Sequence, residues 1–367
     1  ADDTGTAQVK LKRSGTYTVS ASKGDAKSDT ATVDVTENGS TYTATVHFCR
    51  LVLTAPTGSE ITAACGDVAL TASVTGSDET GSVTLYPPTL GSWTITATKG
   101  DDSTSEAINA TEYKDYTLTL DYVNPVLDKN EWKVIKKVAD ADKGANYWAV
   151  GDTKRITLNG KVGATTISNL RVDAFIIGFN HNSGKEGSNR IHFLLGKIGG
   201  KFVGLVDSYY DPSGYATTSG AFTMNTSDTN SGGWAKTQMR STVLGAASDP
   251  TNPTANTLLA ALPADLRAVM KSVTKYTDNT GGGSNSASAV TATTDYLWLL
   301  AEFEVFGSRT YANSSEPSSQ AQYEYFKAGN SKIAYKHSAA ETAAAWRLRS
   351  PNSSYYGYFC AVDSGGG

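Results

Sequence analysis

WRLRSPNSSYYGYFCAVDSGGG, residues 346–367, is the most informative stretch of this sequence. It begins with a Trp, two Arg and a Pro, which restrict the backbone, and continues as a run of Asn, Ser, Tyr and Gly. Tyr provides a large contact area at low conformational-entropy cost, whereas Ser, Asn and Gly provide adaptable hydrogen bonds. This composition predicts a ligand-binding surface.

Two groups of residues are predicted within this stretch. The residues expected to contact a ligand are Asn352, Ser353, Ser354, Tyr355, Tyr356, Gly357, Tyr358, Ala361, Asp363 and Ser364. The residues expected to support them are Trp346, Arg347, Arg349, Pro351, Phe359 and Val362. Aromatic residues dominate binding hot spots, so Tyr355, Tyr356 and Tyr358 are the candidate anchors. An ordinary loop rich in Ser, Tyr and Gly is the alternative interpretation.

Trp346, Arg347 and Arg349 have two interpretations of their own. The planar fork of an Arg binds acidic ligand groups well. We favour a supporting role for all three, because a binding surface must be held in place by packed neighbours.

Length and charge limit the classes of partner. With 367 residues the chain is long for one domain, so two or three domains are expected. Charged residues make up 19% and the net charge is -4, which leaves no basic field for nucleic acid or an anionic membrane. No apolar run approaches the roughly 20 residues that span a bilayer. We therefore expect a soluble chain with no nucleic-acid partner and no membrane insertion.

The three cysteines, Cys49, Cys65 and Cys360, are too few and too irregularly spaced for a disulfide framework or a zinc site. At most one bridge, between Cys49 and Cys65, is compatible with the sequence. Buried free thiols are the interpretation we favour, because free Cys behaves as a small hydrophobic residue.

The N-terminal part alternates apolar and polar residues with period two and contains a repeat. Residues 15–48, GTYTVSASKGDAKSDTATVDVTENGSTYTATVHF, align with residues 91–122, matching Tyr17 to Trp93 and Tyr42 to Tyr116. Such a repeat indicates tandem copies of one β-strand module. The second copy is preceded by further strand-like stretches with no counterpart before residue 9. We expect that the first copy lacks its opening strands and that the natural protein extends upstream.

These modules resemble the small immunoglobulin-like β-sandwiches found in tandem in bacterial adhesins and phage structural proteins. The resemblance depends on the alternation and on the GTYTV and GSWTI strands (residues 15–19 and 91–95). It implies a partial immunoglobulin-like module at residues 1–48 and a second such module at residues 49–123.

The pattern changes near residue 124, where we place a domain boundary, at about 123 to 126. Trp132, Ile135 and Val138 have helical spacing, and strands are expected at 147–158, 173–179 and 190–195. Further helices are expected at 233–244, 263–276, 320–328 and 339–345, a loop at 278–288 and a buried strand at 296–306. The predicted fold class is mainly β plus α+β, with residues 124–367 forming one α+β domain.

Several phrases of this domain resemble a domain of uncharacterised function in structural proteins of gut phages and prophages and in secreted proteins of Firmicutes. They are VGDTKRITLNGKVG (150–163), IIGFNHNSGKEG (176–187), GGWAKTQMRSTVL (232–244), LPADLRAVMKSVTKYT (262–277), DYLWLLAEFEVFG (295–307) and WRLRSP (346–351). The resemblance implies a fold similar to the C-type-lectin-like fold of variable proteins served by diversity-generating retroelements. Such proteins carry variable binding residues on a rigid scaffold.

The residue types of the C-terminal stretch agree with such variation. Substitution at the first two positions of an AAC codon gives Asn, Ser, Tyr, Asp, Gly and Ala, but never Lys, Glu, Gln, Met or Trp. Residues 352–367 contain none of these last five, and Phe359, Cys360 and Val362 interrupt the run as expected scaffold positions. Such domains usually end with a further apolar strand, whereas this sequence ends with Gly365-Gly-Gly.

No metal site and no cofactor are predicted. Glu316-Pro317-Ser318 is near the Glu-Pro-Asn motif of calcium lectins, but its third residue differs and Trp346 is not followed by Asn-Asp. Ca²⁺ requires six to eight oxygen ligands. Residues 180–182 with Glu186 and His192 are an alternative metal cluster, for which we favour a structural role in a hairpin.

The sequence does not predict an enzyme. No GxSxG, HExxH or phosphate-binding glycine loop occurs. Glu302 and Glu304 lie two apart on the expected strand, which allows a glycosidase pair on one face. We favour the solvent face of that strand instead. Cys360 has no neighbouring thiol in the sequence, which the lectin-like formylglycine-generating oxidases require.

We therefore expect a binding protein in which immunoglobulin-like modules carry a C-type-lectin-like display domain. The resemblance implies a receptor-binding component of a virion, on the phage tail or capsid surface, that attaches the particle to a host cell-surface ligand, protein or glycan. Other virion proteins are expected partners, and we expect a homo-oligomer. The alternatives are a secreted or cell-surface bacterial adhesin, a virion decoration protein without receptor binding, and a carbohydrate-active enzyme.

Overall fold

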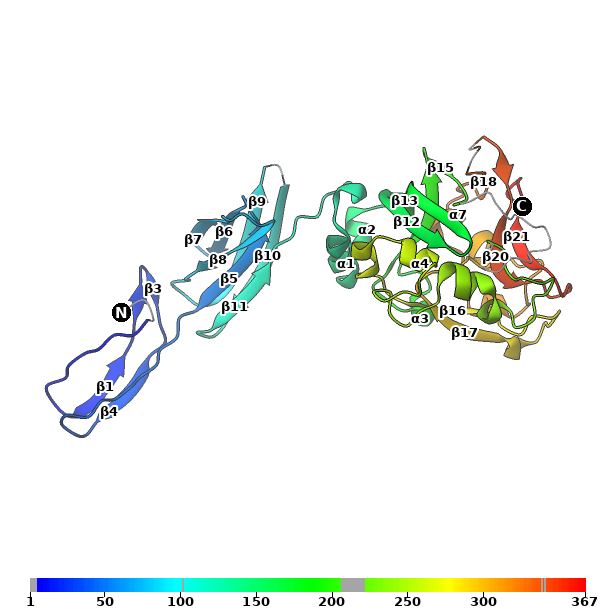
Figure 1. Ribbon diagram of the computed structural model, residues 1–367. Coiled ribbons are helices and arrows are strands. Elements are labelled where there is room, and N and C mark those ends of the chain that lie inside the picture. Colours follow the sequence, from blue (N-terminus) through cyan, green and yellow to red (C-terminus); the bar gives the residue numbers. More distant parts are fainter. Residues whose placement is uncertain (1–4, 101, 206–221, 338, 340) are drawn as a thin grey trace. The chain divides into compact units, whose positions relative to one another are not determined.

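The computed structural model describes residues 5–100, 102–205, 222–337, 339 and 341–367. Strands predominate over helices, so the predicted β-rich fold class is confirmed. The chain divides into two compact units, Ala1–Val123 and Asn124–Gly367 (Figure 1). None of the described helices is long and apolar enough to cross a membrane.

The second predicted module, residues 49–123, forms two sheets around one core. Their strand orders are β10-β9-β6-β7 and β11-β5-β8. The strands are β5 (Arg50–Pro56), β6 (Glu60–Cys65), β7 (Val68–Ser73), β8 (Thr80–Leu85), β9 (Gly91–Lys99), β10 (Asp102–Ala110) and β11 (Asp115–Thr119). Alternate residues point inward, so that Leu51 and Leu53 of one sheet share a core with Trp93 and Ile95 of the other.

The first copy contains only part of this arrangement among its described residues. Its strands are β1 (Gly15–Val19), β2 (Ser22–Lys23), β3 (Ala26–Lys27) and β4 (Ala31–Val35). Tyr17 pairs with Val33 across β1 and β4, as Trp93 pairs with Ile108 across β9 and β10. Tyr17 is only half-buried, whereas Trp93 has no exposed surface. The strands that cover Trp93 have no counterpart in residues 5–48.

A tyrosine contact relates the two copies. The Tyr42 hydroxyl accepts hydrogen bonds from the backbone N–H groups of Thr36 (3.1 Å) and Glu37 (2.9 Å). The Tyr116 hydroxyl accepts the same pair of bonds from Thr111 (2.9 Å) and Glu112 (3.0 Å). The aligned tyrosines therefore close the same local turn. All three cysteines are free, so Cys49 and Cys65 form no bridge.

The second unit is built on a four-stranded sheet and several short hairpins. The sheet has the order β12-β13-β14-β15, formed by β12 (Thr153–Val162), β13 (Thr165–Phe179), β14 (Ile191–Ile198) and β15 (Lys201–Phe202). The hairpins pair β16 (Val273–Asp278) with β17 (Val290–Asp295), β18 (Ala334–Tyr335) with β19 (Ala343–Ala344), and β20 (Trp346–Pro351) with β21 (Phe359–Val362).

The helices in the described part of this unit are short. They are η1 (Leu127–Lys129), α1 (Trp132–Asp140), α2 (Gly144–Tyr147), α3 (Ser183–Glu186), η2 (Trp234–Lys236), η3 (Met239–Leu244), α4 (Leu258–Ala261), α5 (Ala264–Arg267), η4 (Ala287–Ala289), α6 (Glu302–Phe306), η5 (Glu316–Ser318) and α7 (Glu324–Lys327). The predictions of the helix at α1 and of the strands at β13 and β14 are confirmed. The strand expected at 147–158 begins only at Thr153.

Three other predictions were wrong. The helix expected at 263–276 ends at Arg267, and its second half is β16, paired with β17. The strand expected at 296–306 ends in the helix α6. The helix expected at 339–345 contains the strand β19, with residue 340 outside the described residues. In each case tertiary pairing or ion pairing overrides a short apolar pattern that does not by itself distinguish helix from strand.

Candidate functional site

The predicted binding residues 352–358 form a surface loop between β20 and β21, which we call the tyrosine loop. Tyr355, Tyr356 and Tyr358 are 60%, 71% and 45% exposed. Pro351 and Phe359 pair at the base of the loop, and Asn352 N donates to Tyr358 O at 2.9 Å. The loop therefore presents three large aromatic side chains from a closed turn.

Asn352 shapes the loop from within. Its side-chain Oδ1 accepts hydrogen bonds from the backbone N–H groups of Ser354 at 2.8 Å and Tyr355 at 3.2 Å. Asn side chains commonly hold a turn two residues ahead in this way. The rings of Tyr355 and Tyr358 meet edge to face, with centroids 5.9 Å apart. Asn352 is therefore a turn-forming residue as well as a candidate contact.

Tyr311 belongs to the same surface, which the sequence did not predict. Its carbonyl accepts hydrogen bonds from Ser353 N at 2.8 Å and Ser353 Oγ at 3.0 Å, and its side chain is 58% exposed. Residues 311–315, YANSS, share the composition of NSSYY at 352–356. That similarity is the sequence signal that identifies this second segment. We call Tyr311, Tyr355, Tyr356 and Tyr358 the tyrosine surface.

A glycine-rich segment adjoins the tyrosine loop. A Cβ placed on Gly283 would lie 3.6 Å from the Tyr356 ring, so the ring rests against this backbone. A Cβ on Gly357 would overlap the Asp228 carboxylate. Gly357 was predicted as a ligand contact, and any side chain there requires Asp228 to move.

Ala361, Asp363 and Ser364 lie away from the tyrosine loop. Val362 pairs with Trp346 at the far end of the hairpin, so Asp363 lies four strand residues beyond Phe359, or roughly 13 Å. Asp363 Oδ1 accepts from Gly367 N at 2.9 Å and Gly365 N at 2.7 Å. These backbone hydrogen bonds lower the pKa of Asp363. The predicted ligand contacts thus lie at opposite ends of the hairpin, with residues 352–358 in the tyrosine loop and Asp363 and Ser364 after the end of β21.

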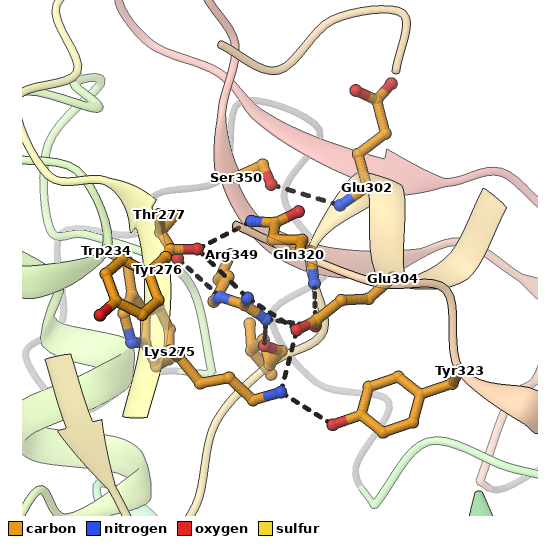
Figure 2. A network of polar contacts seen from close by, with 12 residues as sticks. Trp234, Lys275, Tyr276, Thr277, Glu302, Glu304, Gln320, Tyr323, Arg349 and Ser350 are labelled. Atoms are coloured by element: carbon orange, nitrogen blue, oxygen red, sulfur yellow. Dashed lines mark hydrogen bonds and ion pairs between the residues drawn. The ribbon is translucent and has the colours of Figure 1, made fainter. Parts of the chain in front are cut away.

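Behind the tyrosine loop is a buried network of charges (Figure 2). Arg349 on β20 donates from Nη2 to Glu304 Oε1 at 2.9 Å and from Nη1 to Glu304 Oε2. Its Nε donates to Thr277 Oγ1 at 2.7 Å. Lys275 on β16 donates to Glu304 Oε1 at 2.9 Å and to Glu186 Oε2 at 2.7 Å. These contacts join β16, α6 and β20 beneath the surface.

The network determines the charge state of its members. Burial opposes ionisation of Glu304, but the adjacent Arg349 and Lys275 outweigh it and hold the pKa of Glu304 well below its usual range. Burial, reinforced by Glu304 and Glu186, raises the pKa of Tyr323, whose hydroxyl accepts a hydrogen bond from Lys275 at 2.8 Å. Glu304 is therefore a fixed anion in the core.

Two further buried carboxylates hold the surface loops. Glu302 accepts the backbone N–H of Tyr311 at 3.0 Å and that of Ala312 at 2.8 Å, and its carboxylate points away from Arg349 in Figure 2. Glu316 accepts from Ser350 Oγ at 2.6 Å and from Asp278 N at 2.9 Å. Each carboxylate thus satisfies backbone groups of a segment next to the tyrosine surface.

The prediction that Glu302 and Glu304 occupy the solvent face of a strand was wrong. Both lie on the helix α6 and are buried, at 5% and 0% exposure. Charged residues are buried when they are paired with opposite charges or hydrogen-bonded. Arg349 and Lys275, which lie on strands far away in the sequence, and the N–H groups of the nearby residues 311 and 312 provide those partners.

The other predicted supporting residues belong to the strands β20 and β21 of the hairpin itself. Pro351, Phe359 and Val362 are buried. Trp346 is half-buried, and its Nε1 donates to Lys332 O at 2.8 Å. Trp346, Arg347 and Ser364 line a largely apolar cavity of about 950 Å³ that no residue of the tyrosine loop lines among those described. The cavity and the tyrosine surface therefore share none of the described residues.

One group of residue types that bind metals occurs in the core. Donor atoms of His181, Glu186 and His192 all lie within 4.8 Å of one another. The Lys275 ammonium lies 2.7 Å from Glu186 Oε2 and supplies a positive charge at this position. His181 also stacks on Tyr323 with ring centroids 3.6 Å apart. We interpret the cluster as part of the buried charge network.

Residues 223–367 are similar to a family described as a domain of unknown function, DUF6273. The matched region begins just before Asn230 and includes the tyrosine loop, Tyr311 and the Arg349–Glu304 pair. A comparison with curated proteins finds no match to the chain. The tyrosine surface thus lies wholly within the matched region, whereas Glu186 of the buried network lies outside it.

Proposed function

We propose that this protein binds a ligand through the tyrosine surface. The observation that supports this most directly is the exposure of Tyr311, Tyr355, Tyr356 and Tyr358 on segments whose main chains are hydrogen-bonded to one another. Aromatic side chains on an ordered backbone lose little conformational entropy on binding. Exposed aromatic groups of this kind favour a recognition site over a solvated surface.

We further propose the setting that the sequence resemblance implies. The protein is a virion-associated attachment protein that captures a host cell-surface ligand, and it acts as a homo-oligomer among other virion proteins. Many copies on one particle would raise the effective concentration of binding sites, so that modest affinity at each site suffices. The same binding surface on a bacterial adhesin is the alternative setting.

The proposed architecture is immunoglobulin-like modules followed by a C-type-lectin-like domain. The two sheets that share a core around Trp93 support the first part. The Tyr116 hydroxyl, bound to backbone N–H groups a few residues upstream, resembles the tyrosine corner of such sandwiches. The mixture of one larger sheet, small hairpins and short helices in the second unit is compatible with the second part.

The test is a combined Tyr355→Ala, Tyr356→Ala and Tyr358→Ala variant. We expect loss of adsorption to host cells, with assembly and folding unchanged because these side chains are exposed. Tyr113→Ala and Tyr147→Ala, at exposed tyrosines elsewhere on the chain, are the matched controls. Unchanged adsorption of the triple variant would overturn the proposal and favour a decoration protein without receptor binding.

Population sequencing tests whether the surface is diversified. If it is, codons for residues 354–356 and 358 vary across a population carrying this gene, while those for Phe359, Cys360 and Val362 stay constant. Residues 262–277, which include α5 and β16, provide the reference level of variation. Equal variation in the two segments would contradict diversification.

A further inference from the structure

Asn230 is not among the predicted ligand contacts. It nevertheless forms hydrogen bonds with the tyrosine loop from its first residue to its last. Its side chain is fully buried. Nδ2 lies 3.1 Å from Asn352 O, 2.9 Å from Tyr355 O and 2.8 Å from Tyr358 O. Its backbone N–H donates to Tyr356 O at 2.5 Å. One residue therefore donates hydrogen bonds to four carbonyls of the seven-residue loop.

The opposite side of the Asn230 amide fixes its orientation. Oδ1 accepts a hydrogen bond from Gly282 N at 2.7 Å, so Nδ2 must face the tyrosine loop. Nδ2 has two hydrogens for three carbonyls, so at least one hydrogen is shared. Gly281 has φ +58° and packs so closely on the Asn230 carbonyl that a Cβ there would overlap it. Gly281 and Gly282 thus contact Asn230 on the side opposite the tyrosine loop.

All hydrogen bonds from Asn230 to the tyrosine loop go to main-chain carbonyl oxygens. Within the described part of the chain, the side chains of Ser354, Tyr355, Tyr356 and Tyr358 make no hydrogen bond, and all four residues are exposed. Backbone carbonyls are present whatever side chain a position carries. The hydrogen bonds that hold the loop are therefore independent of the identity of these four residues, whose side chains contribute only ring contacts.

We infer, building on the proposed function, that Asn230 is the positioning residue of the binding surface. It holds the main chain of the tyrosine loop in one conformation so that Ser354, Tyr355, Tyr356 and Tyr358 can be replaced without changing that conformation. Asn352, whose side chain caps the turn, and Gly357, which faces Asp228, belong to the fixed frame. Four positions then set specificity, and three fixed residues set geometry.

Amide hydrogen exchange on the full chain tests this assignment without any ligand. Asn230→Asp keeps the acceptor for Gly282 N but replaces the donor with a carboxylate oxygen facing three carbonyls. We expect exchange of the Asn352, Ser354 and Tyr355 amides to accelerate by about tenfold or more, with the core amides of β13 unchanged. Unchanged exchange of the three loop amides would overturn the assignment.

Asn279→Asp is the matched control. Asn279 Nδ2 donates to Thr291 O at 3.0 Å and its Oδ1 accepts from Ala235 N at 2.9 Å, so it makes the same kind of contacts away from the tyrosine loop. In the Asn279→Asp variant we expect the Asn352, Ser354 and Tyr355 amides to exchange as in the wild type. Equal acceleration in both variants would attribute the effect to added negative charge and overturn the specific role of Asn230.

A second variant tests the decoupling even if Asn230→Asp fails to fold. Ser354→Ala, Tyr355→Ser, Tyr356→Ser and Tyr358→Ser together remove the exposed side chains and leave every contact with Asn230 in place. We expect the Asn352 amide to keep its wild-type protection within about threefold. Loss of that protection would show that the side chains shape the loop. Failure of ligand binding alone would concern the proposed function and not the role of Asn230.

Discussion

The guanidinium of Arg349 and the carboxylate of Glu304 form a two-pronged ion pair, and neither side chain has any exposed surface. Arg349 lies three residues before the tyrosine loop, and Glu304 lies on α6 next to Glu302, which holds Tyr311. The pair therefore couples the base of the loop to the helix that supports the neighbouring segment. The planar fork of Arg suits this geometry in a way that Lys does not.

Arg349→Met is expected to destabilise the protein strongly. It leaves the Glu304 carboxylate buried with Lys275 as its remaining cation, and breaking a buried pair from one side costs about 3–5 kcal/mol. Urea unfolding measures the loss. Arg349→Met with Glu304→Gln should cost less than the sum of the two single changes, because no unpaired charge then remains. Additive losses would contradict the coupling.

The stability difference between wild type and Glu316→Gln should depend on pH. Burial raises the pKa of Glu316 to about 7, from 4.5 for an exposed carboxyl, despite donation from Asp278 N and Ser350. The folded state therefore binds an extra proton between these two values, and wild-type stability falls as the pH rises through this window. The change is at most about 3 kcal/mol, from the 1.36 kcal/mol of each pKa unit.

Unfolding of both proteins at a series of pH values checks this expectation. Subtracting the Glu316→Gln curve removes the contributions of Glu304 and the buried histidines, which are common to both. Glu341→Gln, at a side chain that is 88% exposed, controls for the loss of one carboxylate. A wild-type curve parallel to the Glu316→Gln curve from pH 4.5 to pH 8 would show that folding does not raise the pKa of Glu316.

Gly357→Ala should be coupled to Asp228. The added Cβ would overlap the Asp228 carboxylate, and Asp228 is exposed and free to turn outward, so we expect a cost of only about 1 kcal/mol. In an Asp228→Ala background the same change should cost almost nothing, because the overlapping group is absent. A double-mutant cycle by thermal unfolding measures the difference. The same cost in both backgrounds would locate the strain elsewhere.

The two aligned aromatic residues of the repeat should contribute unequally to stability. Trp93→Ala removes a fully buried ring from the shared core and is expected to cost about 3–5 kcal/mol. Tyr17→Ala, at the aligned position of the first copy, should cost only about 1 kcal/mol because that ring is half-buried. Chemical unfolding measures the two losses of stability. Hydrogen exchange of residues 15–35 and of residues 91–110 shows which copy each substitution destabilises. Equal losses would mean that the first copy has a core of its own.

Local patterns in the sequence were sufficient for much of the architecture. Period-two alternation at residues 91–99 predicts a half-buried strand, because successive side chains point to opposite faces. The matches of Tyr17 to Trp93 and Tyr42 to Tyr116 identify a repeat, whose copies share a tyrosine contact. The composition of residues 352–358 predicts an exposed aromatic loop, since a run of Asn, Ser, Tyr and Gly has too little apolar surface to form a core.

The tertiary structure alone decided which distant residues complete the site. Asn230 reaches the tyrosine loop by hydrogen bonds to backbone carbonyl groups, which every residue has and which therefore leave no trace in a sequence. The composition of residues 311–315 resembles that of residues 352–356, but only the fold brings the Tyr311 carbonyl to Ser353. Glu302 and Glu304 alternate as they would on a solvated strand, yet they are buried because Arg349, Lys275 and the backbone of residues 311–312 compensate their charge. Asp363 and Ser364 are close to the loop in sequence but lie at the other end of the hairpin, because β21 is extended between them.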